Sequence, residues 1–271
     1  MILVAGHYCH DTLLGNAGEH RALGGSAAYA SAILHALGEP HRVVAKVGED
    51  FLYPGEVSQK PQVAPGRTTA FIDDYRGRER QQRVEAVAPP LEPADLDGEY
   101  AVALACAIAG ELPLRTLWRM REISRTVIAD AQSILREIAA DGTVTLRAPD
   151  PEALQAIDFL KASRGEAQAL DLMSLRQRLT LLITDGPGGC IVLGPRVHLH
   201  VPAEPAEERD PTGAGDCFLA GFAAGLARGI PLERAVRLGA WCGARAVEQV
   251  GVPRLDAAAA RAAFRTFLPS P

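Results

Sequence analysis

Apolar positions along the chain follow two patterns: short continuous runs, and residues at helical spacing. Residues 1–5 are apolar and end at Gly6, which predicts a short buried strand. Residues 25–37 carry small and apolar side chains at helical spacing and are closed by Gly38, before another apolar run over residues 43–47. A strand, a helix and a strand in this order predict a βαβ opening and a parallel sheet.

The pattern changes over residues 68–87, where polar residues alternate with apolar ones around a turn at Arg76-Gly77-Arg78. Alternation with a period of two is typical of a strand with one face in water, so we expect a hairpin. Such a hairpin is a candidate lid. Its edge strand would also offer a surface through which a homodimer forms.

Buried strands separated by helices resume after residue 100, with helical spacing over residues 114–123 between the first two. The expected strands cover residues 101–108, 126–129, 156–160, 179–184, 189–193 and 197–201, and the expected final helices cover residues 217–228, 232–248 and 256–267. We therefore predict a single α/β domain over residues 1–271, with a mostly parallel sheet flanked by helices.

Composition narrows the class of protein. Hydrophobic residues make up 48% of the 271 residues and aromatic residues 5%, which suits a parallel sheet wrapped in Ala- and Leu-rich helices. The net charge is −5 without a basic stripe, so we expect no nucleic-acid partner. No apolar run approaches 18 residues and no basic leader is seen, so we expect no membrane contact and a soluble, cytoplasmic protein. Five scattered cysteines predict reduced, mostly buried thiols.

The most informative segment is Asp210-Pro211-Thr212-Gly213-Ala214-Gly215-Asp216, followed directly by apolar residues at helical spacing. Its glycines predict a tight turn whose backbone N–H groups lie at the positive end of a helix dipole and surround an anion such as phosphate. A carboxylate there repels the anion, unless Asp216 takes a proton from an attacking hydroxyl. The segment therefore indicates phosphoryl transfer to an alcohol. The alternative is an N-capped core helix in which Asp216 offsets the helix dipole.

A second segment, Gly24-Gly25-Ser26-Ala27-Ala28-Tyr29-Ala30, precedes the helix that ends at Gly38. Together, the two segments resemble the signatures of the PfkB, or ribokinase-like, carbohydrate kinases. Other segments fall in the order of that family, namely Ala45-Lys46-Val47-Gly48-Glu49-Asp50, Gly110-Glu111-Leu112-Pro113 and Ile183-Thr184-Asp185-Gly186. Within this family, the chain most resembles the myo-inositol kinase branch. The segments that carry this resemblance are Gly6-His7-Tyr8-Cys9-His10-Asp11, Val63-Ala64-Pro65 and Leu160-Lys161-Ala162-Ser163.

The resemblance implies a doubly wound α/β domain with a small β lid, which we place in inserted segments at about residues 12–22 and 66–90. It implies ATP-dependent phosphorylation of a hydroxyl, with Mg²⁺ and, as a further candidate cofactor, a monovalent cation. The acceptor expected from the branch is a small neutral polyol, a cyclitol such as myo-inositol. A sugar such as fructose or ribose, or a nucleoside, is the alternative acceptor. A non-catalytic sugar-binding or regulatory member of the fold is the alternative of a different class.

Site residues follow from the resemblance position by position. Asp216 would be the catalytic base, with the backbone N–H groups of Gly213, Ala214 and Gly215 as the anion hole. Asp11 would accept hydrogen bonds from two adjacent hydroxyls, although a turn after a strand also explains an Asp there.

The other substrate-side residues are Gly25, Tyr29 and Glu111. Gly25 would let the substrate approach the backbone. Tyr29 stands where the family has Asn and adds an aromatic wall to the substrate site. Glu111 matches a lid-side substrate contact, with a charge at a helix N-terminus as the alternative.

On the nucleotide side, Thr184, Gly186 and Gly189 would hold the phosphates and the ribose together with Gly213, and Ala240 would lie near the adenine. A plain turn also explains the glycines after residue 184.

Two further acidic positions complete the candidates. Glu166, in Ser163-Arg164-Gly165-Glu166, matches the metal-associated Glu of the family and would order waters on Mg²⁺; a surface Glu at a helix start is the alternative. Asp130 and Gln132 follow a strand at the carboxyl edge of the sheet, where they would contact substrate or phosphate.

Overall fold

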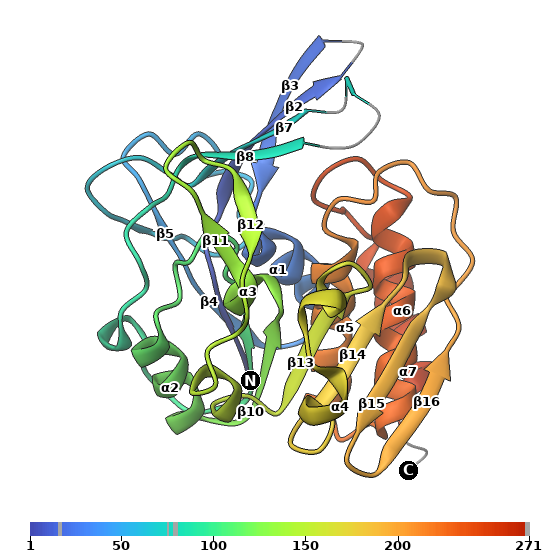
Figure 1. Cartoon of the computed structure of the whole chain (residues 1–271). Helices are drawn as coiled ribbons and strands as arrows, with labels where there is room; N and C mark the ends of the chain where they lie inside the picture. The colour runs from blue at the N-terminus through green and yellow to red at the C-terminus, as the bar shows by residue number, and fades with distance from the viewer. Residues whose placement is uncertain (16–17, 75, 78–80, 269–271) are drawn as a thin grey trace.

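An eight-stranded sheet forms the centre of the computed structural model, which describes residues 1–15, 18–74, 76–77 and 81–268 (Figure 1). Neighbouring strands from β14 to β4 run parallel, and β15 and β16 at the other edge are antiparallel. In spatial order the strands are β16 (Val197–Val201), β15 (Cys190–Gly194), β14 (Thr180–Thr184), β13 (Phe159–Ser163), β10 (Ser124–Asp130), β9 (Tyr100–Ala105), β1 (Ile2–Ala5) and β4 (His41–Val44). The strands that follow β1 lie on both sides of it, so the sheet is doubly wound.

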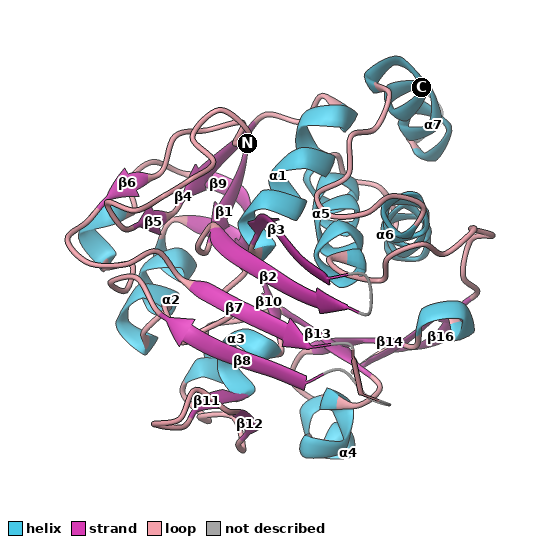
Figure 2. Cartoon of the chain, turned by 90° about the horizontal axis from the view of Figure 1, so that it is seen from above, coloured by secondary structure: helices cyan, strands magenta, loops and turns pink. Residues whose placement is uncertain are grey.

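Helices cover both faces of this sheet (Figure 2). Because successive strand residues point to opposite faces, Ile2 and Val4 of β1 pack into one hydrophobic core and Leu3 and Ala5 into another. The first core contains residues of α1 (Ser26–Leu37), α5 (Ala214–Ala227), α6 (Leu232–Val247) and α7 (Ala257–Phe267); the second contains residues of α2 (Leu114–Glu122), α3 (Gln132–Leu135) and α4 (Leu172–Leu175). Short 3-10 helices lie at Pro93–Asp95, Ala153–Gln155, Glu166–Ala169 and Gly186–Gly188.

A four-stranded sheet stands over the carboxyl ends of the central strands as a lid (Figure 1). Its order is β3 (Gly18–Gly24), β2 (Cys9–Gly15), β7 (Ala70–Asp74) and β8 (Gln81–Ala86), with a parallel pair in the middle. Two-stranded sheets are formed by β5 (Lys46–Val47) with β6 (Gln62–Val63) and by β11 (Arg136–Ile138) with β12 (Val144–Leu146).

The β11–β12 hairpin reaches up to the lid. The Val84 N–H on β8 donates to the carbonyl of Gly142, in the turn of the hairpin, at 2.9 Å. Arg83 and Thr143 form an isolated antiparallel bridge beside this bond. One edge of the lid is therefore tied to a segment that leaves the central sheet after β10.

The expected fold class, with its lid, is confirmed, and the differences lie in boundaries. The strand expected at residues 156–160 begins only at Phe159, because it pairs with β14 as far as Ser163. The lid segment expected at residues 12–22 is a pair of strands that starts earlier, at Cys9. The hairpin of β11 and β12 was missed, and Arg78 of the expected turn lies outside the described residues.

Two expectations from composition can be compared with the structure. All five cysteines are free and buried, as expected. No helix in the described part of the chain has the length and apolarity needed to cross a membrane.

Candidate active site

The turn before α5 is held by glycine geometry and by one carboxylate. Gly213 has a left-handed φ of 74°, and a Cβ there would lie 2.0 Å from the ring atom Cδ1 of Tyr29, so only glycine fits. Asp210 accepts hydrogen bonds from the N–H groups of Thr212 and Gly251, both at 2.9 Å. These bonds fix the turn that precedes α5, at the helix end whose N–H groups have no acceptor within the helix.

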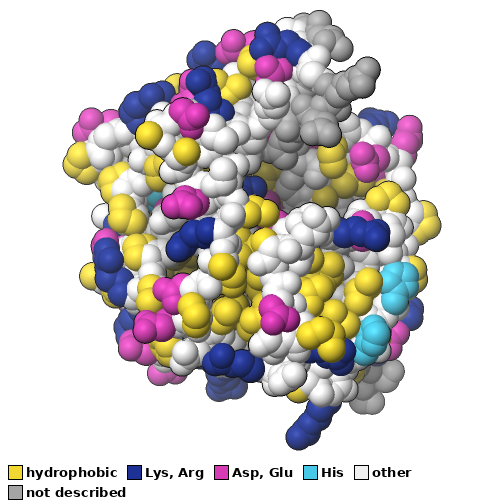
Figure 3. All heavy atoms as spheres, viewed as in Figure 1, with side chains coloured by type: hydrophobic (Ala, Val, Ile, Leu, Met, Phe, Trp, Pro, Cys, Tyr) yellow, Lys and Arg dark blue, Asp and Glu magenta, His cyan; other side chains and the backbone are white. Residues whose placement is uncertain are grey.

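Two cavities lie on the two sides of this turn. We call the first the lid pocket, because it lies beneath the lid and is lined by Asp11, Gly25, Tyr29, Gly213 and Asp216, among others. We call the second the glycine pocket; it is lined by Thr184, Gly186, Gly189, Ala214, Gly215 and Ala240, among others. The face drawn in Figure 3 is hollowed between the lid and the body, with charged side chains in the hollow. The start of α5 therefore separates two potential ligand sites.

The lid pocket encloses about 120 Å³ and is rich in polar groups. Three of the substrate-side residues expected from the sequence, Asp11, Gly25 and Tyr29, line it together with Asp216. Asp11 projects from lid strand β2, whereas Tyr29 belongs to α1 and Asp216 to α5. The pocket is thus built jointly by the lid and the body.

Several lining residues were missed by the sequence analysis, namely Asp73 and Gln82 on the lid and Arg136 on β11. Asp73 is almost fully buried, and the Gln82 amide donates to its Oδ1 at 3.0 Å. A signal for Asp73 was present, because it shares the inward face of β7 with Phe71 at the period of two. The hairpin that carries Arg136 also had a signal, Asp141-Gly142 just before residues 144–146, which the sequence analysis did not use. The Arg136 guanidinium donates to the carbonyl of Ile108 at 3.2 Å.

Glu111 lies elsewhere than expected, because it does not line the lid pocket. Its side chain is buried, and its carboxylate accepts hydrogen bonds from the N–H groups of His7, Ile108 and Ala109 at 2.7–3.2 Å. The carboxylate therefore ties the loop after β1 to the loop after β9. Through Ile108, which does line the pocket, Glu111 supports the wall of the site.

Asp216 is partly buried, and its Oδ1 is a buried atom without a hydrogen-bond partner. Burial raises the pKa of Asp216 to about 6, and the charge of Asp130 adds to the rise. Lys161, a hydrogen bond from Ser26 and Arg136 act in the opposite direction on this pKa. A carboxylate with a free oxygen and a pKa near neutrality, facing a polar pocket, is suited to accept a proton.

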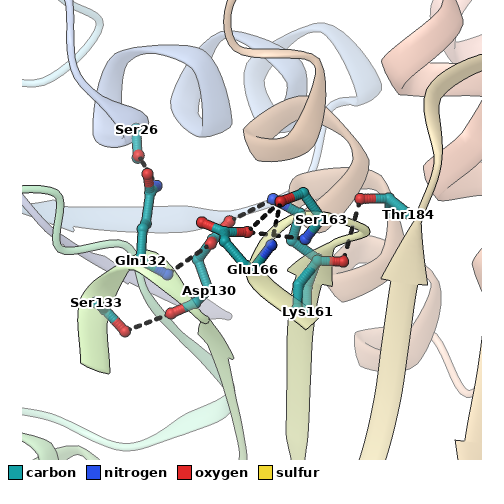
Figure 4. Close-up of polar contacts among 9 residues, drawn as sticks. Ser26, Asp130, Gln132, Ser133, Lys161, Ser163, Glu166 and Thr184 are labelled. Carbon is teal, nitrogen blue, oxygen red and sulfur yellow. Dashed lines mark hydrogen bonds and ion pairs between the residues drawn. The ribbon is translucent and has the colours of Figure 1, made fainter. Parts of the chain in front are cut away.

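The ends of β10, β13 and β14 carry a polar network below this site (Figure 4). Lys161 of β13 forms a buried ion pair with Asp130 of β10, with Nζ to Oδ2 at 2.8 Å. The backbone N–H of Gln132 donates to Asp130 at 3.1 Å, and the Gln132 amide donates to Ser26 Oγ at 2.9 Å. Gln132 also lines the lid pocket. The network therefore links the strand ends to α1, which forms part of the wall of that pocket.

The glycine pocket encloses about 430 Å³. Four nucleotide-side residues expected from the sequence line it: Thr184, Gly186, Gly189 and Ala240; Gly213 lies in the lid pocket instead. A Cβ at Gly189 would lie 2.3 Å from the Val201 carbonyl oxygen, which explains the glycine there. An apolar part of the wall is formed by Phe218, Ala240, Ala244 and Val247.

Glu166 begins a 3-10 helix after β13, and its Oε2 accepts from both the N–H and the hydroxyl of Ser163 at 2.8 Å. Both bonds go to Oε2, so Oε1 keeps its capacity to hold a water. Within the described residues, no group of three or more His, Cys, Asp or Glu residues could hold a metal ion. One carboxylate near an anion site fits Mg²⁺, which usually keeps several waters and substrate phosphate oxygens in its shell.

Comparison with known proteins gives relatives over nearly the whole chain. The model of the pfkB family carbohydrate kinases matches residues 146–256, which include Lys161, Glu166 and the turn before α5. Inositol 3-kinase of Zea mays is 38% identical over 276 residues, which cover 93% of this chain and 73% of that protein. Inositol 3-kinase of Arabidopsis thaliana is 34% identical over 94% of this chain and 76% of its own length.

A solved structure supports the same assignment at the level of the fold. A pyrophosphate-dependent kinase of the ribokinase family, complexed with a pyrophosphate analog and myo-inositol, matches with a TM-score of 0.82 and 20% identity. The match covers 96% of this chain and 100% of that chain. The family expected from the two sequence segments is therefore confirmed, and the chain belongs to the pfkB family of carbohydrate kinases.

Proposed function

We propose that this kinase transfers the γ-phosphoryl group of ATP to a hydroxyl of a small cyclitol, with myo-inositol as the first candidate. The observation that carries the proposal is the position of Asp216, which faces the lid pocket, while Ala214 and Gly215 of the same turn line the glycine pocket. Relatives at 34–39% identity are inositol 3-kinases, which supports the choice of acceptor.

Transfer follows from this arrangement. An acceptor hydroxyl in the lid pocket donates its proton to the Asp216 carboxylate as its oxygen attacks the γ-phosphorus. A new bond forms between that oxygen and phosphorus, and the bond to the oxygen of ADP breaks. The N–H groups of Gly213, Ala214 and Gly215 stabilise the charge on the transferred group. Asp216 supplies the one step that backbone groups cannot, acceptance of the proton.

The lid pocket favours a compact acceptor with many hydroxyls. Its volume of about 120 Å³ is well below the 300–1,000 Å³ of pockets for drug-sized ligands, which disfavours a nucleoside. Carboxylates of Asp11 and Asp73, the amides of Gln82 and Gln132 and the guanidinium of Arg136 offer acceptors and donors around it. A ring that carries a hydroxyl on each carbon suits this wall, whereas Tyr29 supports one face of the ring.

The glycine pocket favours ATP over pyrophosphate as donor. Pyrophosphate would need only the anion hole, whereas this pocket extends along the apolar residues Phe218, Ala240 and Val247, which suit a flat purine. We place Mg²⁺ near Glu166, where it would neutralise charge on the phosphates through water. A monovalent cation and a homodimer through the lid stay predictions; light scattering of the purified protein tests the latter.

The test is ADP release by the purified protein with ATP, Mg²⁺ and a panel of acceptors that includes myo-inositol, other cyclitols, fructose, ribose and nucleosides. We expect a cyclitol to give the highest kcat/KM. A response only to a sugar or a nucleoside would reject a cyclitol as the acceptor, whereas the kinase activity itself would stand. ATP binding without turnover on any acceptor would favour a non-catalytic member of the fold.

The identity of the phosphoryl donor is tested separately. Replacing Ala240 by Leu should raise the KM for ATP severalfold, because the side chain enters the apolar part of the glycine pocket, and should leave the KM for the acceptor unchanged. If pyrophosphate supports turnover at least as well as ATP, the assignment of that pocket is wrong.

A further inference from the structure

The ion pair between Lys161 and Asp130 is buried, with 7% and 1% of the two residues exposed. Replacing a buried ion pair by apolar residues is often neutral or even stabilising, so stability alone does not explain why charges stand here. Asp130 is the last residue of β10, and Lys161 is its partner on the neighbouring strand β13 (Figure 4). The place of the pair, rather than its strength, is its informative property.

The Lys161 ammonium lies against the start of α5. A Cβ at Gly215 would approach Lys161 Nζ to 2.5 Å, so glycine at this position makes room for the cation. A cation at a helix N-terminus opposes the helix dipole and costs stability in the free protein. An anion bound at the same turn is attracted both by the cation and by the N-terminal end of the helix dipole. The arrangement is therefore suited to a negatively charged group that is present only during turnover.

We propose that Lys161 is a positioning residue for phosphoryl transfer, which keeps a fixed positive charge under the anion hole and beside Asp216, and that Asp130 anchors it there. The inference rests on the proposed function and extends it to two residues outside both pockets. Lys161 keeps Asp216 ionised and ready to accept the hydroxyl proton, and it stabilises the phosphoryl group through the turn.

The charges around Asp216 act in opposite directions. Burial and Asp130 favour its protonated form, whereas Lys161 and Arg136 favour the carboxylate. The pKa of Lys161 itself is lowered by burial and raised by its neighbours, Asp130 first, so that it stays charged. The other titratable groups that interact with Asp216 are Cys9, Tyr29, Cys106 and Cys217, whose pKa values are all raised by burial and which therefore stay neutral.

The experiment compares Lys161→Met and Asp130→Asn with the wild type over pH 5–9. Loss of the Lys161 charge should lower kcat on the order of 10²-fold, the usual effect of removing one preorganised stabilising group. It should also move the acidic limb of the kcat profile to higher pH by about one unit. Loss of the Asp130 charge should move the same limb to lower pH. A merely structural role would lower activity in both variants without moving the limb in opposite directions, and that result would overturn the proposal.

The chain offers a control in the ion pair of buried Lys46 with half-buried Asp95, at 2.6 Å, which touches neither pocket. Lys46→Met and Asp95→Asn should leave the acidic limb in place. If they move it as far as the Lys161 and Asp130 variants do, the effect is not specific to the site.

A substrate-free measurement separates this inference from the proposed function. For the wild type, Lys161→Met and Asp130→Asn, Tm is measured against pH with and without the additional substitution Asp216→Asn. The pH range over which the difference in Tm changes reports the pH at which Asp216 ionises. This pH should rise in Lys161→Met and fall in Asp130→Asn, whichever acceptor the enzyme uses. Unchanged values would reject the inference even if myo-inositol is phosphorylated, and shifted values would retain it even if another polyol is the acceptor.

Discussion

At the scale of single residues, Asp216 shows how the requirements of chemistry and of stability diverge. Its buried Oδ1 has no partner, and burial raises its pKa to about 6. A base that titrates near neutrality is well matched to proton transfer at pH 7. The same burial opposes the ionised form that the proposed reaction needs, so ionisation of Asp216 lowers the stability of the folded protein.

Asp216→Asn should lower kcat by roughly 10²–10⁴-fold, the usual contribution of a positioned base, and leave ATP affinity largely intact. In the wild type, kcat should fall as the pH drops through about 6, because protonation removes the base. Steady-state kinetics checks both, with circular dichroism as the control for folding. An Asn variant that turns over within about threefold of wild type would reduce Asp216 to a helix cap.

Asp216→Asn, which should lower kcat, should raise the stability of the folded protein at neutral and alkaline pH. Between the ordinary pKa of 3.8 and about 6, the folded protein keeps a proton that the unfolded chain releases, so Asp216 lowers the free energy of unfolding as pH rises through this window. Well above pH 6 the penalty no longer changes with pH. Asp216→Asn should therefore raise Tm at pH 8 and change it little at pH 4. Calorimetry that finds a lower Tm for the variant at pH 8 would contradict this.

Glu166→Gln should raise the Mg²⁺ concentration needed for half-maximal rate more than it changes the KM of the acceptor, because Glu166 is expected to hold Mg²⁺ through water. Titration of Mg²⁺ at saturating ATP and acceptor measures the effect. Glu233→Gln, on the surface of α6, is the control. An unchanged Mg²⁺ titration would place Glu166 outside the metal site.

At the scale of elements, the β11–β12 hairpin connects the lid to the wall of the lid pocket. Its turn accepts the bond from Val84 on β8, and its first strand carries Arg136 into the lid pocket. Gly142, in the turn, has a φ of 84°, and a Cβ there would lie 2.2 Å from the carbonyl oxygen of Val84. The lid is therefore supported at one edge by the segment that carries Arg136 into the lid pocket.

Gly142→Ala should raise the KM of the acceptor severalfold, because the new methyl group pushes the hairpin away from β8. Gly229→Ala is the matched control, since Gly229 also has a positive φ, of 68°, but no atom within 4 Å of an added Cβ. Gly229→Ala should lose about 1 kcal/mol of stability through backbone strain, and Gly142→Ala should lose more, because its methyl group also meets the Val84 carbonyl oxygen. A similar rise in KM for both, or for neither, would mean that the hairpin does not support the site.

Sequence reasoning was strongest where local rules and site chemistry coincide. Gly213 and Asp216 could be placed because a tight turn, a helix start and an acid occur within a few residues. Asp73 and Arg136 were not placed, because Asp73 depends on which face of the lid turns inward and Arg136 depends on a hairpin whose turn signal, Asp141-Gly142, was overlooked. Glu111 was assigned to the substrate, since nothing local reveals that three backbone N–H groups converge on it.

At the scale of the whole molecule, the lid pocket, where we propose that the acceptor binds, is shared by the lid and the body. Asp11 and Asp73 come from the lid, whereas Gly213 and Asp216 come from the body. A ligand between them adds contacts that the free protein lacks, so binding should stabilise the folded chain as a unit.

Myo-inositol at about 100 times its Kd should increase the free energy of unfolding by about 2.7 kcal/mol, visible as a rise in Tm of several degrees. Asp11→Asn should reduce the rise caused by myo-inositol and keep the rise caused by ATP with Mg²⁺, because Asp11 lines only the lid pocket. Thermal shift measures both. Loss of both responses would mean that the variant is damaged beyond its site.

The contact between Tyr29 and Gly213 constrains the order in which this enzyme can change. A ring at position 29 leaves no room for even a methyl group at position 213, where Cβ would lie 2.0 Å from Cδ1. A smaller residue can replace Tyr29 at any time and widen the pocket beside the anion hole. A side chain at position 213 can enter only after the ring is gone, and then still meets the left-handed backbone. Substitutions that reshape the lid pocket at these two positions must therefore occur in a fixed order, first at residue 29 and only then at residue 213.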